Sequence, residues 1–525
     1  MRDFHLPGRS TVYATEGMCA TSHPLAASVA VDILRRGGTA ADAAIAGAVL
    51  LGICEPQMCG IGGDMFALIK PAASEDIQAL NASGRAPAAF DAESLRQAGH
   101  ALMPKTSPHA VTLPGAVAGF AVLSDRHGKL GLDALLAPAI AYCETGVPVA
   151  PRVARDWAGS EDRLQGAARE VFLHAGKPPK AGDLFRMPKL AEALKAIAKS
   201  GAEGFYTGDV AADLVAVLRA TGGTHREEDF SAVRADWDTP IAGPYRGIEI
   251  VEHPPNGQGT AALLLADILA QFDIAGMDPH SLERLHIEAE AQKLAYDARN
   301  RFVADPQAMS DPGRLQRPGL AAELAALIDP DKAMDQTTRI TESVHKDTIY
   351  ITVVDRDRMA VSLIFSIFDT FGSGLASSRY GILLHNRGAG FSLEAGHPNE
   401  AAPGKRPMHT IIPGMLRDNG RVCMSFGVMG GQYQAAGHAR LVSNLVDLGM
   451  DPQQAIDAPR MFVEDGALRL ERGYDYALLE ALAAKGHQVE VPDAPIGGAQ
   501  AIRIDASGVL AGGSDPRKDG CALGY

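Results

Sequence analysis

The chain has 525 residues, of which 46% are hydrophobic and 21% charged, and its formal net charge is −14. This composition is typical of a globular protein that buries a large core, without low-complexity segments or internal repeats. The acidic balance, with no long basic run, argues against a nucleic-acid-binding protein. Length alone would suggest two or three domains.

Residues 1–7 contain charges and no apolar signal core, so we expect no secretory signal and a cytoplasmic protein. The longest apolar stretch, residues 43–54, is too short to span a bilayer, which predicts no membrane segment. The cysteines form no CxxC pair, and we expect reduced, mostly buried thiols at Cys19, Cys54, Cys59, Cys143, Cys423 and Cys521.

Two helices and a strand are predicted near the start of the chain. Residues 22–36 carry apolar side chains at helical spacing and end at Gly37-Gly38, a helix stop signal. Residues 40–51 predict a second helix, which carries small side chains on all sides and is therefore expected to be buried between layers. The glycine-rich turn at residues 60–64 opens a strand at 65–69. It lacks GxGxxG spacing and a GK[ST] ending, which favours a tight turn over a phosphate loop.

The middle of the chain is predicted to be mainly helical. Amphipathic patterns place helices at residues 132–146, 188–201, 211–221, 261–272 and 282–303, and a β-branched run places a strand at 245–251. His286 and Glu290, four residues apart, could suggest a metal site. Because no further histidine completes it in the sequence, we expect an exposed helix face and no metal.

A hairpin is predicted after a polar connector. Residues 331–346 lack apolar periodicity, which is typical of an exposed connector. Residues 347–355 and 360–368 are rich in β-branched and aromatic side chains, which predicts two antiparallel strands. The polar residues between them place the turn at Asp357.

With that turn, Thr348 faces Ser366 at the open end of the hairpin. A threonine behind a connector suits a nucleophile freed by chain cleavage, because its α-amino group, with a pKa of roughly 7.7 to 8.0, can act as general base. Threonine-rich strands are common, however, and the residues alone favour two ordinary cross-strand hydroxyls.

The segment around Asp347-Thr348 resembles the maturation site of the gamma-glutamyltranspeptidase family of N-terminal-nucleophile hydrolases. The hairpin leads into Asp369-Thr370-Phe371-Gly372-Ser373-Gly374, which also resembles that family. Further matches occur in the family's order over nearly the whole chain, at residues 37–44, 60–64, 381–384, 405–407, 429–431, 458–460, 514–517 and 524–525. Each motif alone is weak, but together they are highly specific.

The resemblance implies an α/β protein with the αββα four-layer sandwich of N-terminal-nucleophile hydrolases. It also implies a proenzyme that cuts itself between Asp347 and Thr348. The products would be a large subunit of residues 1–347 and a small subunit of residues 348–525, which together form one structural domain. The resemblance implies no cofactor, and the mature heterodimer could associate further.

By resemblance, Thr348 would be the nucleophile, and Ser366 would supply a second hydroxyl that assists it. Gly430 and Gly431 match the family's oxyanion hole, whose backbone N–H groups stabilise the tetrahedral intermediate. Glycine suits this role because the backbone must approach the substrate closely. Without the resemblance, an ordinary tight turn is the better interpretation of Gly430-Gly431.

The loop after residues 381–384 differs in sequence from the same loop of transpeptidase-type members, where it holds the substrate's α-ammonium group. Here the acidic position aligns with Gly390, an amide position with Arg387, and another polar contact with Phe368. An ammonium beside Arg387 would be repelled and left unpaired. This predicts a pocket for a carboxylate without an α-amino group, although Arg387 could instead form a structural ion pair.

Other candidate substrate contacts are also altered. The family's carboxylate-binding arginine aligns with Ser83, and Arg85 lies two residues later on the same strand face. Arg85 could therefore bind an anion or be a surface arginine. His409 and Thr410 stand where the family often has two serines that contact the carboxylate. The segment at residues 391–405 is shorter than in family members with a lid, which predicts a more open entrance to the substrate pocket.

These features predict a self-processing amidohydrolase that hydrolyses small-molecule amides whose acyl group bears a carboxylate. The loop Asn386-Arg387-Gly388 resembles the oxamate amidohydrolase and glutaryl acylase-like branch of the family, which implies an acyl group of the oxamate or glutaryl type. One alternative is a glutathione hydrolase or gamma-glutamyltransferase in which other residues contact the ammonium. Another is a catalytically silent family member with a binding or structural role. The intact Thr348 and Gly430-Gly431 argue against the silent member.

Overall fold

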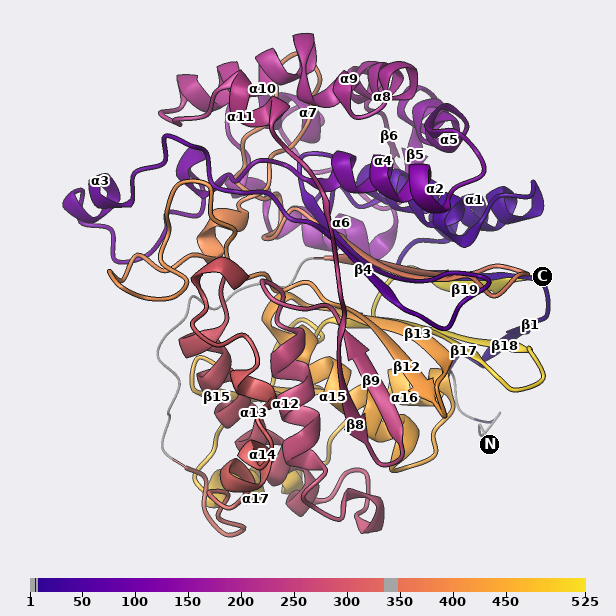
Figure 1. The fold of residues 1–525 in the computed structure, drawn as a ribbon, viewed down its shortest axis with the longest axis vertical. Helices are drawn as coiled ribbons and strands as arrows, with labels where there is room; N and C mark the ends of the chain where they lie inside the picture. The colour runs from indigo at the N-terminus through magenta and orange to yellow at the C-terminus, as the bar shows by residue number, and fades with distance from the viewer. Residues whose placement is uncertain (1–4, 6–7, 335–347) are drawn as a thin grey trace.

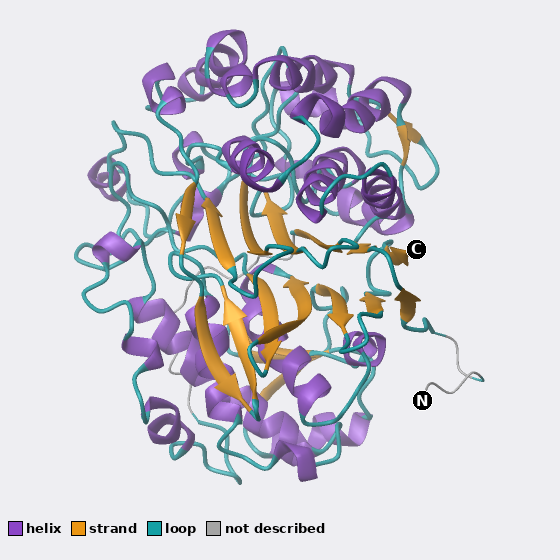
Figure 2. Ribbon diagram, turned by 45° about the vertical axis from the view of Figure 1, so that its right-hand side comes forward, coloured by secondary structure: helices purple, strands orange, loops and turns teal. Residues whose placement is uncertain are grey.

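The structure is a computed structural model that describes residue 5, residues 8–334 and residues 348–525. Two seven-stranded sheets pack face to face, and helices cover the outer side of each (Figures 1 and 2). The layers therefore follow the order α, β, β, α, as predicted for the fold class.

Both sheets combine strands from the two ends of the chain. The first has the order β19 (Cys521–Gly524), β2 (Met18–Thr21), β10 (Ile349–Val354), β11 (Ala360–Ser366), β3 (Asp64–Lys70), β4 (Gln78–Ala82) and β7 (Asp236–Asp238). The second has the order β1 (Val12–Ala14), β18 (Leu510–Ser514), β17 (Gly498–Ile504), β13 (Arg421–Met429), β12 (Pro413–Asp418), β9 (Ile248–Glu252) and β8 (Ile241–Tyr245). Two small sheets are formed by β14 (Met461–Glu464), β15 (Ala467–Leu470) and β16 (Gln488–Glu490), and by β5 (Val147–Pro148) and β6 (Leu184–Phe185). Because β10 and β11 lie between β2 and β3, residues before and after the connector share one core.

The two helical layers come from different parts of the chain (Figure 1). The layer over the first sheet contains α1 (Pro24–Arg35), α2 (Ala40–Cys54), α4 (Ala116–His127), α5 (Leu132–Thr145), α7 (Ala167–Phe172), α8 (Pro188–Ser200), α9 (Glu203–Tyr206), α10 (Gly208–Ala220) and α11 (Glu227–Ser231). The layer over the second sheet contains α12 (Gly259–Leu269), α13 (Leu282–Phe302), α14 (Leu320–Ala325), α15 (Gln434–Val446), α16 (Pro452–Asp457) and α17 (Tyr476–Ala484). The short helices α3 (Ala92–Gln97) and α6 (Pro151–Ala158) complete the first half. The predicted helices are confirmed to within a few residues at their ends.

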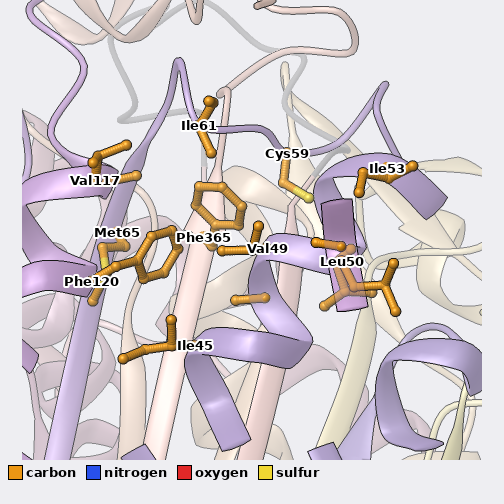
Figure 3. Close-up of a cluster of buried hydrophobic side chains, with 14 of the residues drawn as sticks. Ile45, Val49, Leu50, Ile53, Cys59, Ile61, Met65, Val117, Phe120 and Phe365 are labelled. Carbon is orange, nitrogen blue, oxygen red and sulfur yellow. The ribbon is translucent and has the colours of Figure 1, made fainter. Parts of the chain in front are cut away.

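Helix α2 is the element on which the first sheet packs. All of its residues are buried, and Thr39 begins it with a capping box to Asp42. Figure 3 shows Val49 of this helix beside Phe365 of β11, with Leu50 and Ile53 farther from that ring in the same apolar cluster. A Cβ atom on Gly47 would lie only 2.5 Å from the Ile351 side chain, so this glycine permits close contact between α2 and β10. The predicted burial of this helix is confirmed.

One predicted strand is wrong at its start. Residues 245–251 do not form a single strand, because the chain turns between β8 and β9 at Arg246 and Gly247. Both residues have positive φ, 48° and 89°, as in the tight turns favoured by antiparallel hairpins. The turn was missed in the sequence because the β-branched residues of β9 follow it directly.

All six cysteines are free thiols, and four of them are buried. Within the described part of the chain, no helix combines the length and apolar character needed to cross a bilayer.

Glu55, which ends α2, gives a pH-dependent stability prediction. Burial raises the pKa of its carboxyl group to about 7, and Ser22 Oγ donates a hydrogen bond to it. A raised folded-state pKa stabilises the fold at low pH, and this contribution is lost as pH rises through the folded value. From pH 5 to pH 8 the wild type should lose roughly 2–3 kcal/mol through this group. Thermal unfolding of Glu55→Gln should show a smaller loss over this range, whereas parallel pH curves would contradict the prediction.

Candidate active site

The hairpin has the predicted register. Ile349 of β10 pairs with Phe365 of β11, so the preceding Thr348 stands opposite Ser366. Both residues are buried, and the Thr348 hydroxyl lies 3.5 Å from Ser366 Oγ. The pairing of the two hydroxyls is thereby confirmed. Asp347 lies outside the described residues, so the predicted cleavage site is described only from its Thr348 side.

Phe368 links this hairpin to the substrate loop. Its backbone N–H donates to Ser366 Oγ at 2.9 Å, and its φ is 78°, which bulky residues rarely adopt. Its ring lies 4.1 Å from the guanidinium carbon of Arg387, an arrangement suited to a cation–π interaction. Such strained backbone occurs preferentially at functional sites. Phe368 therefore connects the Thr348–Ser366 pair to Arg387.

Gly430 and Gly431 follow β13 and precede α15. Their φ values are 124° and 56°, and a Cβ atom on Gly430 would lie 2.9 Å from Gly497 Cα. Gln258 holds this turn by donating from Nε2 to the Gly431 carbonyl at 3.1 Å, and Arg299 Nη1 donates to Gln258 Oε1 at 2.6 Å. Both positions have a backbone conformation that favours glycine, and Gly430 also lacks space for a side chain. The oxyanion role remains a prediction.

The structure brings several predicted substrate residues around Asp64, which sequence reasoning had treated only as the end of a turn. His409 Nε2 lies 3.2 Å from Asp64 Oδ2, and Arg387 Nε lies 3.6 Å from the same oxygen. Arg387 Nη1 donates to Thr410 Oγ1 at 3.3 Å. His385 joins the cluster, its Nδ1 lying 3.5 Å from Asp64 Oδ2. We call Asp64, His385, Arg387, His409 and Thr410 the Asp64 cluster.

Asp64 is held as an anion. Two backbone groups, Gly84 N–H and Gly115 N–H, donate to its Oδ1 at 3.1 and 3.3 Å. Burial alone would raise the pKa of Asp64, but the charge that His385 carries when it is protonated and the hydrogen bond from His409 hold this pKa well below its ordinary value. The sequence did show that Asp64 follows the glycine-rich turn at residues 60–63 and begins a strand. Its partners were not, because they lie hundreds of residues away.

Arg387 is a completely buried cation with spare hydrogen-bonding capacity. Burial lowers its pKa to about 9, although Asp64 acts in the opposite direction, so the side chain stays charged at neutral pH. Within the described residues, Nη2 has no hydrogen-bond partner. A buried guanidinium donor without a partner is costly, and a carboxylate ligand would satisfy it in bidentate geometry.

Arg85 lies in a different environment. Its side chain is 36% exposed, and Nη1 contacts Asp305 Oδ2 at 3.4 Å and donates to the Gly404 carbonyl at 3.0 Å. The family position at Ser83 is buried and donates to Asn81 Oδ1 at 2.8 Å. The structure therefore does not place Arg85 in the Asp64 cluster.

A cavity of about 620 Å³ opens beside these residues. Phe368, Gly390 and Gln432 line it on the side of the site, and Leu102 and Phe391 contribute apolar walls. The volume falls within the range of small-molecule sites. Neither Thr348 nor Arg387 lines this cavity. Phe368, which lines it, contacts both Ser366 and Arg387, so the cavity offers space for a substrate next to that residue.

The expectation of an exposed helix face at His286 and Glu290 is wrong. Both are buried, and His286 Nδ1 lies 2.8 Å from Nε2 of His487. This histidine is 201 residues away, so its proximity could not be predicted from sequence spacing. Lys293 Nζ donates to Glu290 Oε1 at 2.7 Å, so the carboxylate is already neutralised. Glu290 and Lys293 also bond the backbone of Met334, which explains the cluster as an anchor for that segment.

Comparison with known protein families shows to which family the chain belongs. A sequence profile described as gamma-glutamyltranspeptidase matches residues 26–525. The chain belongs to the gamma-glutamyltranspeptidase family. It is 33% identical to the "Glutathione hydrolase-like YwrD proenzyme" of Bacillus subtilis, over 98% of this chain and 99% of that protein. It is 34% identical to the "Oxamate amidohydrolase proenzyme" of Klebsiella pneumoniae, over 98% and 100%.

A solved structure, the cephalosporin acylase from Bacillus halodurans, is similar over the whole chain. Its TM-score is 0.92 at 37% identity, and the match covers 100% of this chain and 99% of that one. These comparisons confirm the predicted family and the αββα fold class, and they show that the chain is an enzyme, an amidohydrolase of this family. They set aside the catalytically silent interpretation. The subunit boundary and the roles of individual residues remain predictions.

Proposed function

We propose that this gamma-glutamyltranspeptidase family member hydrolyses amides of small acyl groups that carry a carboxylate, of the oxamate or glutaryl type. The observation that carries the proposal is Arg387, fully buried beside the hairpin with Nη2 unpartnered within the described chain. Phe368 covers one face of the guanidinium, whereas carboxylates bind its edge. The ring and the substrate anion therefore do not compete for Arg387.

The proposed reaction starts with cleavage between Asp347 and Thr348, which frees the α-amino group of Thr348. Thr348 Oγ then attacks the amide carbonyl, and the α-amine takes the hydroxyl proton. The backbone N–H groups at Gly430 and Gly431 stabilise the oxyanion. The α-ammonium returns the proton to the leaving amine as the C–N bond breaks. Water, deprotonated by the same amine, then cleaves the acyl ester and releases the acid.

Ser366 and the Asp64 cluster act around this centre. Ser366 Oγ, 3.5 Å from the Thr348 hydroxyl, keeps that hydroxyl at the open end of the hairpin. Arg387 and Thr410 face the acyl carboxylate, and His409 is held in place by Asp64. The cavity of about 620 Å³ exceeds what an oxamate or glutaryl group needs, which leaves room for a bulky leaving amine.

A second candidate is a glutathione hydrolase. The "Glutathione hydrolase proenzyme" of Escherichia coli is 32% identical over 98% of this chain, nearly the same identity as the oxamate amidohydrolase. The two functions differ in whether the site accepts an α-ammonium group. The buried positive charge of Arg387 favours the acyl groups that lack it.

A pair of chromogenic substrates tests the proposal. Glutaryl and gamma-glutamyl p-nitroanilides differ only by the α-ammonium group, so their ratio of kcat/KM isolates that group. We expect the glutaryl substrate to be favoured by roughly 100-fold, the effect of about 3 kcal/mol. Butyryl p-nitroanilide, which lacks the carboxylate, should be a poor substrate and serves as the control for the anion site. Faster turnover of the gamma-glutamyl substrate would support the glutathione hydrolase instead.

A further inference from the structure

His385 has an unused nitrogen that faces a carboxylate. Its Nε2 lies 2.7 Å from the Thr112 carbonyl oxygen, which can only accept a hydrogen bond, so Nε2 carries a hydrogen. Its Nδ1 faces Asp64 Oδ2 at 3.5 Å and makes no hydrogen bond within the described residues. In neutral His385 this places a lone pair opposite an anionic oxygen. A proton on Nδ1 would turn this contact into a charge-assisted hydrogen bond.

His409 cannot take that role as readily. Its Nδ1 accepts a hydrogen bond from Ile411 N–H at 3.3 Å, so its hydrogen is on Nε2, directed at Asp64. Protonation of Nδ1 would break the bond to Ile411. Burial and the charge of Arg387 also lower the pKa of His409 to about 3.

The remaining titratable groups near the Asp64 cluster are also committed. His225 Nε2 lies 2.8 Å from the Val111 carbonyl, and burial lowers its pKa to about 4. Burial raises the pKa of Tyr206 beyond the working range, and its hydroxyl donates to the Pro114 carbonyl. His385 is therefore the group placed to accept a proton beside Asp64.

The charge of the cluster changes when a substrate anion enters. In the free site the charge of Arg387 is offset by Asp64, whose Oδ2 lies 3.6 Å from Arg387 Nε. Asp369 also acts on Arg387 and is itself paired with Arg163 Nη2 at 3.2 Å. A carboxylate on Arg387 adds one negative charge in a buried place, which is costly without compensation. We propose that binding of the acyl carboxylate at Arg387 is coupled to uptake of one proton by His385 Nδ1, which then donates to Asp64. This inference rests on the proposed function.

The coupling has a defined sign. Since the bound state holds one more proton than the free state, affinity for the acid weakens as pH rises, by up to about tenfold per unit. A cluster without proton uptake would bind the fully ionised acid equally well over the same range.

Isothermal titration of glutarate into the mature wild-type enzyme at pH 8 measures the coupling. HEPES and Tris differ in ionisation enthalpy, and the slope of binding heat against that enthalpy counts protons. We expect uptake of about one proton per glutarate in the wild type and in His127→Asn, a histidine whose Nε2 lies 3.0 Å from Gln78 Oε1 instead of near Asp64. In His385→Asn we expect retained binding with a slope near zero.

The outcomes separate the two proposals. No binding of glutarate would overturn the anion site of the proposed function, and this inference with it. Binding with no proton uptake would overturn this inference alone. An unchanged slope in His385→Asn would place the proton elsewhere, for example on the α-amine of Thr348, and would also overturn it.

A second measurement avoids the variant, in case His385→Asn does not mature. The inhibition constant of glutarate for the wild-type enzyme should rise up to about tenfold per unit over part of the range from pH 6 to pH 8, where Arg387 keeps its charge. An inhibition constant that stays flat over this range would overturn the inference.

Discussion

Replacing Thr348 by alanine should leave the protein as one uncut chain with amidase activity reduced at least about 10⁴-fold. The substitution removes the hydroxyl that lies 3.5 Å from Ser366, and with it the proposed nucleophile for both cleavage and hydrolysis. Intact mass and N-terminal sequencing provide the measurement. The wild type should give two fragments, the smaller beginning Thr-Ile-Tyr-Ile.

Thr352→Ala is the matched control for this experiment. Thr352 is a buried threonine of the same strand, bonded through Oγ1 to Ser425 Oγ at 2.7 Å, and it has no place in the proposed chemistry. This variant should still cut itself into two fragments. A wild type that remains uncut, or a Thr348→Ala protein cut before residue 348, would contradict the assignment of the nucleophile.

Replacing Arg387 by glutamine should lower kcat/KM for glutaryl p-nitroanilide by roughly 100-fold or more. The substitution removes a buried guanidinium whose Nη2 has no partner within the described residues and is proposed to bind the acyl carboxylate. A lost charge-assisted pair in a buried site costs about 3 kcal/mol, which corresponds to this factor. Butyryl p-nitroanilide has no carboxylate, so its kcat/KM should change much less.

Arg85→Gln is the control for Arg387, because Arg85 is partly exposed and contacts Asp305 and Gly404. Its kcat/KM for the glutaryl substrate should stay within a few-fold of the wild type. Self-cleavage of Arg387→Gln into two fragments would show that the variant folds. Equal losses for the glutaryl and butyryl substrates would identify Arg387 as a structural residue, the alternative that its sequence position left open.

The local elements of this fold follow from short-range sequence signals. The stop at Gly37-Gly38, the small residues of α2 and the β-branched runs around Asp357 each act within a few residues. The pairing of Thr348 with Ser366 needed only the position of one turn. The failure at Arg246 and Gly247 is of the same kind, since a two-residue turn was concealed by its apolar neighbours.

The candidate site required the tertiary structure. Sequence motifs named Thr348, Arg387 and the glycine pair, but no local pattern joined Asp64 to Arg387 or His286 to His487. The separation of Arg85 from Arg387 was equally invisible, because strand-face arguments do not say which loop packs over that face.

The sequence by itself therefore determined the helices, the hairpin, the family and the identity of most candidate residues. These depend on backbone preferences and on motifs read over a few positions. The tertiary structure alone decided which charges meet in the buried Asp64 cluster and which arginine is left with an unpartnered donor. Those properties depend on distances and burial between residues far apart in the chain, which are set when the two sheets and their loops pack together.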